Sequence, residues 1–174
     1  MSEVRGPDNA QERDGALERL VGQYQTTLLR TCFLYLGDRA LAEDAVQETF
    51  MKAYRHMEAF RGECSERTWL VKIAVNVCRD LRRTAWFRFT DRRVTPEMLP
   101  EPTVPCSRQD EALTEAVMRL PLKLRETVLM YYYHQMTVYE IAETLKLSQS
   151  SVSGRLQRAR GKLRDALEGR ETHA

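Results

Sequence analysis

The chain has 174 residues, a formal net charge of +2 and a mean hydropathy of −0.52. No run approaches the roughly 18 consecutive apolar residues of a membrane-spanning helix, and the N-terminus lacks the apolar core of a signal peptide. With only 8% aromatic residues and 8 Gly, the composition argues against a β-sandwich. We therefore expect a cytoplasmic protein whose length suits one large domain or two small ones.

Apolar periodicity predicts two consecutive helices in the first part of the chain. Residues 1–14 are polar and aperiodic, and we expect them to form a flexible tail. Apolar residues then recur at helical spacing over 17–36, and Gly37 is expected to end that helix. Asp38 has the right position to cap a second helix, whose apolar stripe extends over 41–57.

A third helix is predicted from about residue 66 to residue 86, with Ser65 as its N-cap. Four of the six prolines then fall between residues 96 and 105, a density that no helix tolerates. We expect an extended linker at this point. The predicted parts of the chain are a tail at 1–14, a first domain at 15–90, the linker at 91–107, a second domain at 108–168 and a tail at 169–174.

The second half is again helical and ends in a helix-turn-helix pattern. Helices are predicted over 109–120 and from 121 to about 134. Thr137 and Glu140 then have the spacing of a capping box that starts a short helix. After a tight turn, Ser148 is the expected N-cap of a longer helix with a basic outer face. This order is typical of helix-turn-helix DNA-binding domains, so the predicted fold class is all-α, with two small helical domains joined by a Pro-rich linker.

Basic residues are concentrated in two stretches of the chain. Residues 61–93 contain nine Lys or Arg and four Asp or Glu, and residues 146–164 contain six basic residues and no acidic one. Between them, residues 94–118 contain five acidic residues and one Arg. Two basic regions joined by an acidic connector indicate two contacts with one polyanion. The alternative, that these arginines are merely solvated, is weaker because the nearby helices mix both signs.

Each basic stretch has side chains suited to a different form of nucleic acid. At the start of the last helix, short polar and basic side chains can reach base edges in the major groove. These candidates for duplex contact are Ser150, Ser151, Ser153, Arg155, Arg158 and Arg160. The third helix carries an amide among basic residues on one face, with aromatic residues nearby, a combination suited to unpaired bases. Its candidates are Lys72, Asn76, Arg79, Arg82 and Arg83, whereas Trp69 falls on the apolar stripe and is expected in the core.

No motif indicates catalysis, a cofactor or a metal ion. The chain has no Gly-rich phosphate loop, no HExxH and no GxSxG sequence. Its four cysteines are too widely spaced for a zinc site, and Cys32 and Cys78 lie in apolar helical patterns where cysteine is usually buried. We therefore expect no enzymatic activity, no cofactor and no metal.

Three segments, in this order, resemble the extracytoplasmic-function (ECF) sigma factors of bacteria. They are LAEDAVQETFMKAYRHMEAFRG (41–62), TWLVKIAVNVCRDLRR (68–83) and LPLKLRETVLMYYYHQMTVYEIAETLKLSQSSVSGRLQRARGKL (120–163). The resemblance implies that the first domain is sigma region 2 and the second is region 4. The implied partners are core RNA polymerase, promoter DNA as duplex and as melted non-template strand, and an anti-sigma factor, often membrane-anchored, that holds the protein inactive.

The resemblance also implies roles for particular residues. The segment 44–52 matches the helix that docks on the clamp coiled coil of the polymerase, which assigns that contact to Asp44, Gln47, Glu48, Phe50 and Lys52. The loop 60–66 and the following helix match the part that recognises and melts the minus-ten element, in which Phe60 and Asn76 match positions lining a pocket for a flipped-out base. The minus-ten contacts are thus Phe60, Arg61, Lys72, Asn76, Arg79, Arg82 and Arg83, and the serines and arginines of the last helix would read the minus-thirty-five element.

Two segments depart from the family pattern. Many members have Thr-Val-Lys/Arg-Ser/Thr-Arg where this chain has 151–155, so Ser153 removes a basic contact and Gly154 costs about 1 kcal/mol of helix propensity. In the minus-ten loop, Cys64 and the pair Glu66-Arg67 replace a small or aromatic run. Two other functions stay open: an autonomous helix-turn-helix regulator whose first domain senses a ligand or dimerises, and a polymerase-binding regulator that no longer reads promoters.

Overall fold

The computed structural model describes residues 7–84 and 108–171, and every regular element within them is a helix. The first group comprises α1 (Pro7–Leu36), α2 (Arg39–His56), a short 3-10 turn η1 (Met57–Ala59) and α3 (Glu66–Thr84). The second comprises α4 (Arg108–Arg119), α5 (Leu122–Val128), a π-helical turn η4 (Leu129–Tyr133), α6 (Val138–Leu145) and α7 (Gln149–Glu171). The predicted all-α class is therefore confirmed for this part of the chain. The predicted linker at 91–107 and the ends at 1–6 and 172–174 lie outside the described residues.

The caps predicted for the first group of helices are present. Gly37 adopts φ +70°, and its amide donates a 2.8 Å hydrogen bond to the carbonyl four residues earlier, which ends α1. The Asp38 carboxylate accepts a 3.1 Å hydrogen bond from the Leu41 amide at the start of α2. At the start of α3, the Ser65 hydroxyl accepts a 3.0 Å hydrogen bond from the Thr68 amide. Because residue type and spacing determine such local bonds, they could be predicted from the sequence.

α1 begins at Pro7 and therefore includes residues 7–14 of the tail that the sequence predicts at 1–14. Polar contacts hold this first part of the helix against α2. The Arg13 guanidinium donates a 2.9 Å hydrogen bond to the Tyr54 carbonyl and lies 4.5 Å from the centroid of the Tyr54 ring. The Tyr54 hydroxyl in turn donates to Asp14 over 2.9 Å. Apolar periodicity does not detect this extension, because charged side chains stabilise it.

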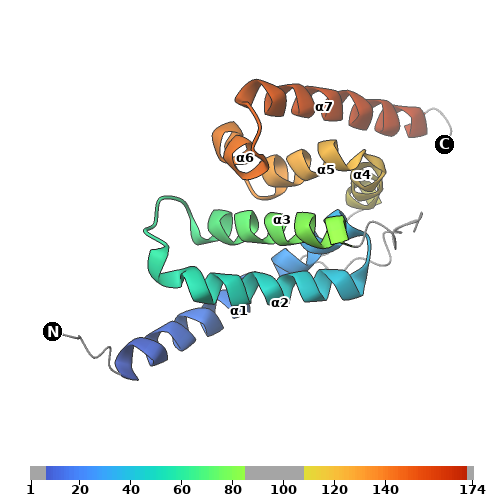
Figure 1. Ribbon diagram of the computed structural model, residues 1–174. Helices are drawn as coiled ribbons and strands as arrows, with labels where there is room; N and C mark the ends of the chain where they lie inside the picture. The colour runs from blue at the N-terminus through green and yellow to red at the C-terminus, as the bar shows by residue number, and fades with distance from the viewer. Residues whose placement is uncertain (1–6, 85–107, 172–174) are drawn as a thin grey trace.

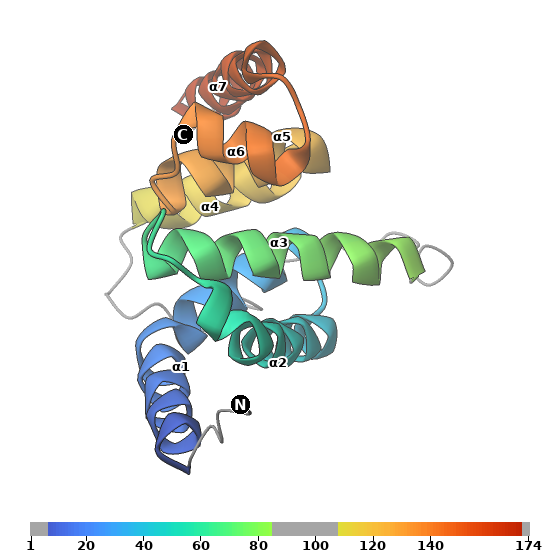
Figure 2. The ribbon, with the colours of Figure 1, turned by 60° about the vertical axis from the view of Figure 1, so that its left-hand side comes forward.

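α3 lies at the centre of the molecule, between the two groups of helices (Figure 1). α1 and α2 lie on one side of it and α5 and α6 on the other, while α7 is outermost in the second group (Figure 2). One apolar cluster joins the groups. Cys32 and Cys78, which are buried as predicted, belong to the same cluster as Met136 and Ile141. We refer to the interface between α1–α3 and α4–α7 as the seam.

α6 and α7 form the predicted helix-turn-helix. The Thr137 hydroxyl accepts from the Glu140 amide at 3.1 Å, and the Glu140 carboxylate accepts from the Thr137 amide at 2.8 Å, so the capping box is complete. α6 ends at Lys146, which adopts a left-handed conformation with φ +54°. The Ser148 hydroxyl then caps α7 by accepting a 3.2 Å hydrogen bond from the Ser151 amide. These contacts fix the angle at which α7 leaves the turn.

Candidate polymerase and promoter interfaces

The outer face of α3 carries most of the residues predicted to contact the minus-ten element. Asn76, Arg79 and Arg83 are exposed, and Lys72 is half-buried. Arg83 forms an exposed ion pair with Asp80 at 3.1 Å, and such surface pairs contribute little and exchange readily for a phosphate. The face therefore presents one amide, able to hydrogen-bond a base edge, among cationic side chains able to bind phosphates.

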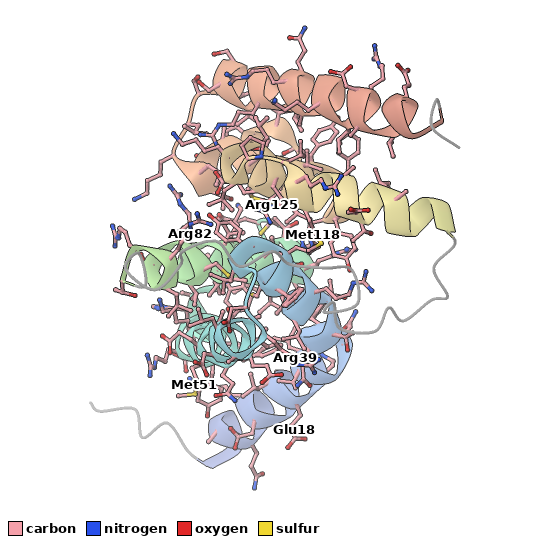
Figure 3. The ribbon with its side chains drawn as sticks, turned by 90° about the vertical axis from the view of Figure 1, so that its right-hand side faces the viewer. Glu18, Arg39, Met51, Arg82, Met118 and Arg125 are labelled. Carbon is pink, nitrogen blue, oxygen red and sulfur yellow. The ribbon has the colours of Figure 1, made fainter. Side chains whose placement is uncertain are left out.

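Arg82 lies on a different side of α3 from Asn76. It is half-buried at the seam, and Figure 3 shows it on the side of α3 that approaches Arg125 of α5. Burial lowers the pKa of Arg125 from its ordinary value, and the nearby Arg82 guanidinium lowers it further. The Arg125 guanidinium also donates a 3.0 Å hydrogen bond to the Leu34 carbonyl across the seam. The structure thus places Arg82 apart from the other predicted minus-ten residues.

The loop before α3 brings two aromatic rings together. Phe60 stacks on Trp69 with ring centroids 4.6 Å apart and an interplanar angle of 21°. Trp69 also packs against the main apolar cluster, in agreement with its predicted place in the core. Gly62, with φ +74°, allows the tight turn that carries the chain back to α3, and Arg61 beside it is exposed. Phe60 is only half-buried, so the pair links the core to the surface at the beginning of α3.

The unusual pair Glu66-Arg67 has structural partners. Arg19 of α1 binds both oxygens of the Glu66 carboxylate, at 2.6 and 2.9 Å. Hydrogen bonding by Arg19 lowers the pKa of Glu66 from its ordinary value. Arg67 points the other way, across the seam, and donates a 2.7 Å hydrogen bond to the Tyr133 carbonyl. Both side chains therefore bind other parts of the protein. These contacts explain why Glu66 and Arg67 differ from the family pattern without assigning either residue a contact with a DNA base.

The predicted polymerase-contacting residues of α2 separate into exposed and buried ones. Asp44 and Gln47 are exposed. Glu48 and Lys52 are half-buried and lie 3.9 Å apart as an i,i+4 ion pair. Phe50, in contrast, is only 7% exposed and belongs to the main apolar cluster. Its side chain supports the helix from inside, and in this conformation it does not reach a partner.

Met51 is a surface residue of α2 that the sequence analysis did not include. Its side chain is 53% exposed and projects away from the protein (Figure 3). It lies four residues after Gln47 and seven after Asp44, so these three share one face of the helix. Helical spacing alone would have indicated this position. An exposed methionine beside a carboxylate and an amide gives the face an apolar contact point.

At the start of α7, the three predicted serines are all exposed. The Ser148 hydroxyl lies 3.0 Å from that of Ser150 and 2.8 Å from that of Ser151, so the first turn contains a cluster of hydroxyl groups. Ser153 follows on the exposed surface, and Arg158 is exposed two turns into the helix. A Cβ added at Gly154 would meet nothing within 4 Å, so the backbone is open to close approach there.

Two of the predicted arginines of α7 bind other parts of the protein. Arg155 has a side chain that is 14% exposed, and its guanidinium forms a 2.8 Å ion pair with Glu126 of α5. The same guanidinium donates to the Lys123 carbonyl at 3.2 Å. Arg160 donates a 2.5 Å hydrogen bond to the Tyr132 hydroxyl and lies over its ring. Arg158 is therefore the better-placed of these arginines for contact with DNA.

Gln157 is a second residue that the sequence analysis did not include. It is exposed and lies seven residues after Ser150 and four after Ser153, on the same face of α7. A glutamine amide can both donate to and accept from an adenine edge in the major groove. Its helical spacing from Ser150 and Ser153 is the sequence signal that indicates this position.

Comparison with known proteins agrees with both halves of this description. The model of sigma-70 region 2 matches residues 20–88, and that of sigma-70 region 4 matches residues 110–163, so the chain is of the sigma-70 class. The ECF RNA polymerase sigma factor SigL of Mycobacterium tuberculosis is 32% identical over 175 residues, covering 97% of each chain. SigW of Bacillus subtilis is 27% identical over 166 residues, covering 87% of this chain and 89% of SigW. The protein belongs to the ECF RNA polymerase sigma factors.

Solved structures of sigma factors have a similar fold. CnrH, in complex with the cytosolic domain of CnrY, is 28% identical with a TM-score of 0.63, covering 92% of this chain and 94% of CnrH. RpoE of Bartonella quintana, in complex with the anti-sigma factor NepR, has a TM-score of 0.67 at 20% identity, covering 94% of this chain and 98% of RpoE. Within residues 7–84 and 108–171, none of the helices combines the length and the apolar composition of a transmembrane span.

Membership of this family establishes the general function. Sigma factors are non-catalytic initiation factors that bind core RNA polymerase and direct it to promoters, so the protein acts in promoter-directed transcription initiation. The match to region 2 over 20–88 gives the first domain a role that an autonomous helix-turn-helix regulator would not have.

Proposed function

We propose that α3 and the loop before it bind the melted non-template strand of the minus-ten element. The observation that carries this proposal is the stacked pair of Phe60 and Trp69, with centroids 4.6 Å apart, at the beginning of the face that also carries Lys72 and Asn76. Stacking on an aromatic side chain stabilises an unpaired base by about 1–3 kcal/mol, and Asn76 adds a donor and an acceptor for a base edge. A paired base, stacked inside its duplex, gains neither contact.

Promoter melting by this route needs only differential binding. The protein binds the single strand more tightly than the duplex and shifts the equilibrium by that difference in free energy. Moving a two-state equilibrium from 1:99 to 99:1 requires about 5.5 kcal/mol, which a few stacked or hydrogen-bonded bases supply. The proposed mechanism therefore includes no covalent step, no metal and no cofactor, and the protein is not an enzyme.

We propose that core RNA polymerase binds the face of α2 defined by Asp44, Gln47 and Met51. α2 lies on the opposite side of α3 from α5 and α6, so the second group of helices does not cover it (Figure 1). The exposed methionine would provide buried apolar area at the contact, and the carboxylate and the amide would provide orientation. Because the partner is core RNA polymerase, we place the protein in the cytoplasm.

The minus-thirty-five element would be read by the outer face of α7. Ser150, Ser153 and Gln157 share this face and would contact base edges, and Arg158 would bind a phosphate. α7 is the outermost helix of its group, so a DNA duplex can approach it (Figure 2). Because these base-reading side chains are uncharged, we expect the protein to prefer a minus-thirty-five sequence different from one that an arginine on this face would read.

We further propose that an anti-sigma factor binds a cavity of about 470 Å³ that crosses the seam. Its lining is mostly apolar and comes from α1, α4, α5, η4 and α7, including Leu34, Val117 and Leu163. Arg30 and Arg160 also line it, so it suits an apolar helix flanked by acidic residues. Support comes from the similar sigma factor CnrH, whose structure contains the cytosolic domain of CnrY. A partner seated there would contact both groups of helices.

The minus-ten proposal is tested by replacing Asn76 with Ala in a reconstituted transcription reaction. We expect permanganate reactivity of promoter thymines to fall at least tenfold, while binding to core RNA polymerase stays unchanged. Gln23→Ala is the matched control, because it removes an exposed amide from α1 rather than from α3. Unchanged thymine reactivity in Asn76→Ala would exclude the assigned role of Asn76.

A further inference from the structure

The cavity that crosses the seam has the size and the lining of a small-molecule site. Its volume of about 470 Å³ lies within the range of about 300–1,000 Å³ that is typical of ligand pockets. Six aliphatic side chains form most of its wall: Leu34, Leu113, Val117, Val128, Leu129 and Leu163. Two of its other lining residues are arginines, and no carboxylate of the described residues lines it. An apolar wall with only cationic charges favours a ligand that is both apolar and anionic.

Arg30 of α1 contributes a charged side chain to this wall, and its donors are not all satisfied. The residue is half-buried, and its Nε atom is buried without a hydrogen-bond partner in the part of the chain that the structure describes. A buried donor without an acceptor is unfavourable, above all in a charged group. A guanidinium can bind both oxygens of a carboxylate through two parallel N–H groups. A conformation that turns the Nε–H toward a ligand carboxylate is therefore favoured over the ligand-free one.

The π-helical turn η4 contributes a second set of polar groups. Such turns are rare and occur frequently at functional sites. Tyr132 and Tyr133 of η4 line the cavity and are 50% and 36% exposed, so they lie at its opening. The Tyr132 hydroxyl accepts a hydrogen bond from Arg160, and its own proton can then be donated to an anionic ligand.

Charge and volume together indicate the class of ligand. A phosphate monoester carries about 1.5–2 negative charges at pH 7, so its transfer into an apolar cavity is more costly than that of a carboxylate. The single charge of a carboxylate is compensated by one guanidinium. At about 30 Å³ for each non-hydrogen atom, decanoate occupies about 360 Å³. A carboxylate with a medium-length apolar chain therefore fills most of the cavity.

We propose that this cavity binds a free medium-chain carboxylate. The carboxylate binds the Arg30 guanidinium, the apolar chain packs against Val117 and Leu163, and the Tyr132 hydroxyl is a further donor at the opening. The anti-sigma factor proposed above would use the same cavity, so the bound carboxylate would exclude it. Only this last consequence rests on the proposed function, because binding of the carboxylate needs no partner protein.

The test is calorimetric titration of the full chain with decanoate, kept below its micelle concentration. We expect saturable binding at one site and a higher thermal unfolding midpoint with the ligand present. Arg30→Met removes the guanidinium but keeps a long side chain, and it should lower the affinity at least tenfold. Arg55→Met is the matched control, because Arg55 is an exposed arginine of α2 outside the cavity lining, and it should bind like the wild type. Decanol, which has the same chain without the charge, should bind at least tenfold more weakly than decanoate.

Val117→Phe provides a second variant, because it fills part of the cavity and leaves both arginines in place. It should also weaken decanoate binding at least tenfold, with circular dichroism to verify that the helices stay folded. Absence of saturable binding to the wild type would leave the cavity to a protein partner alone and would refute the inference. Wild-type affinity in Arg30→Met, or in folded Val117→Phe, would place the ligand elsewhere and refute it as well.

Transcription by core RNA polymerase with this protein, without decanoate, tests the proposed function separately. A protein that starts transcription but binds no decanoate contradicts only the carboxylate site. A protein that binds decanoate in the expected way but starts no transcription on any promoter contradicts only the proposed function.

Discussion

Phe50 and Met51 are adjacent in the sequence but have opposite surroundings, so their replacement separates folding from polymerase binding. Phe50 is 7% exposed within the main apolar cluster, whereas Met51 is 53% exposed on the proposed polymerase face. Truncating a buried phenylalanine to alanine costs about 3–5 kcal/mol, a large part of the 5–15 kcal/mol that stabilises a typical domain. Truncating an exposed side chain usually changes the free energy of unfolding by less than about 0.5 kcal/mol.

We therefore expect Phe50→Ala to lower the free energy of unfolding by about 3 kcal/mol or more, measured by urea denaturation followed by circular dichroism. Met51→Ala should unfold like the wild type but bind core RNA polymerase about fivefold to thirtyfold more weakly in a fluorescence competition assay. Arg39→Ala, at an exposed position near the start of α2, provides a surface control. Wild-type stability of Phe50→Ala, or wild-type affinity of Met51→Ala, would refute the assignment of these two side chains.

Four further expectations follow from the contacts described. Arg158→Ala should reduce the magnitude of the slope of log K against log salt for minus-thirty-five DNA by about 0.9, because one phosphate contact is lost. Arg155→Ala should chiefly destabilise the protein, by about 3 kcal/mol, because it leaves Glu126 buried without its cation. The pKa of His134 is lowered to about 3 in the folded protein, so the unfolded chain binds this proton more readily. The free energy of unfolding should therefore fall by up to about 1.4 kcal/mol per pH unit as the pH decreases from 6 to 3. His134→Gln should remove that dependence in an acid titration. Thr137→Ala removes the capping box of α6 and should cost about 1 kcal/mol in thermal unfolding.

The local structure of this protein was predictable because the responsible residues are close together in the sequence. Asp38, Ser65, Thr137 and Ser148 each cap a helix by accepting from the amide three residues further on. Such bonds depend on residue type and spacing, and tertiary packing does not override them. The same reasoning correctly identified Gly37 as the residue that ends α1.

The residues at the seam could not be assigned from the sequence. Glu126 and Tyr35 are far apart in the chain, and nothing local marks either as a contact. Arg155 has the basic character of a DNA-binding residue, but its partner Glu126 lies on another helix. Phe50 was a polymerase candidate by resemblance, although its position on the apolar stripe of α2 indicated burial. For Glu126, Tyr35 and Arg155, tertiary packing rather than residue type determines what the side chain contacts.

The central claim is that this protein directs core RNA polymerase to promoters through α3 and α7. The most direct measurement is in vitro transcription by core RNA polymerase over a genomic promoter library, with and without the protein. We expect new, sequence-specific start sites that depend on the protein and are lost in Asn76→Ala but retained in Gln23→Ala. A result with no new start sites, together with specific duplex binding by the protein alone, would contradict the claim.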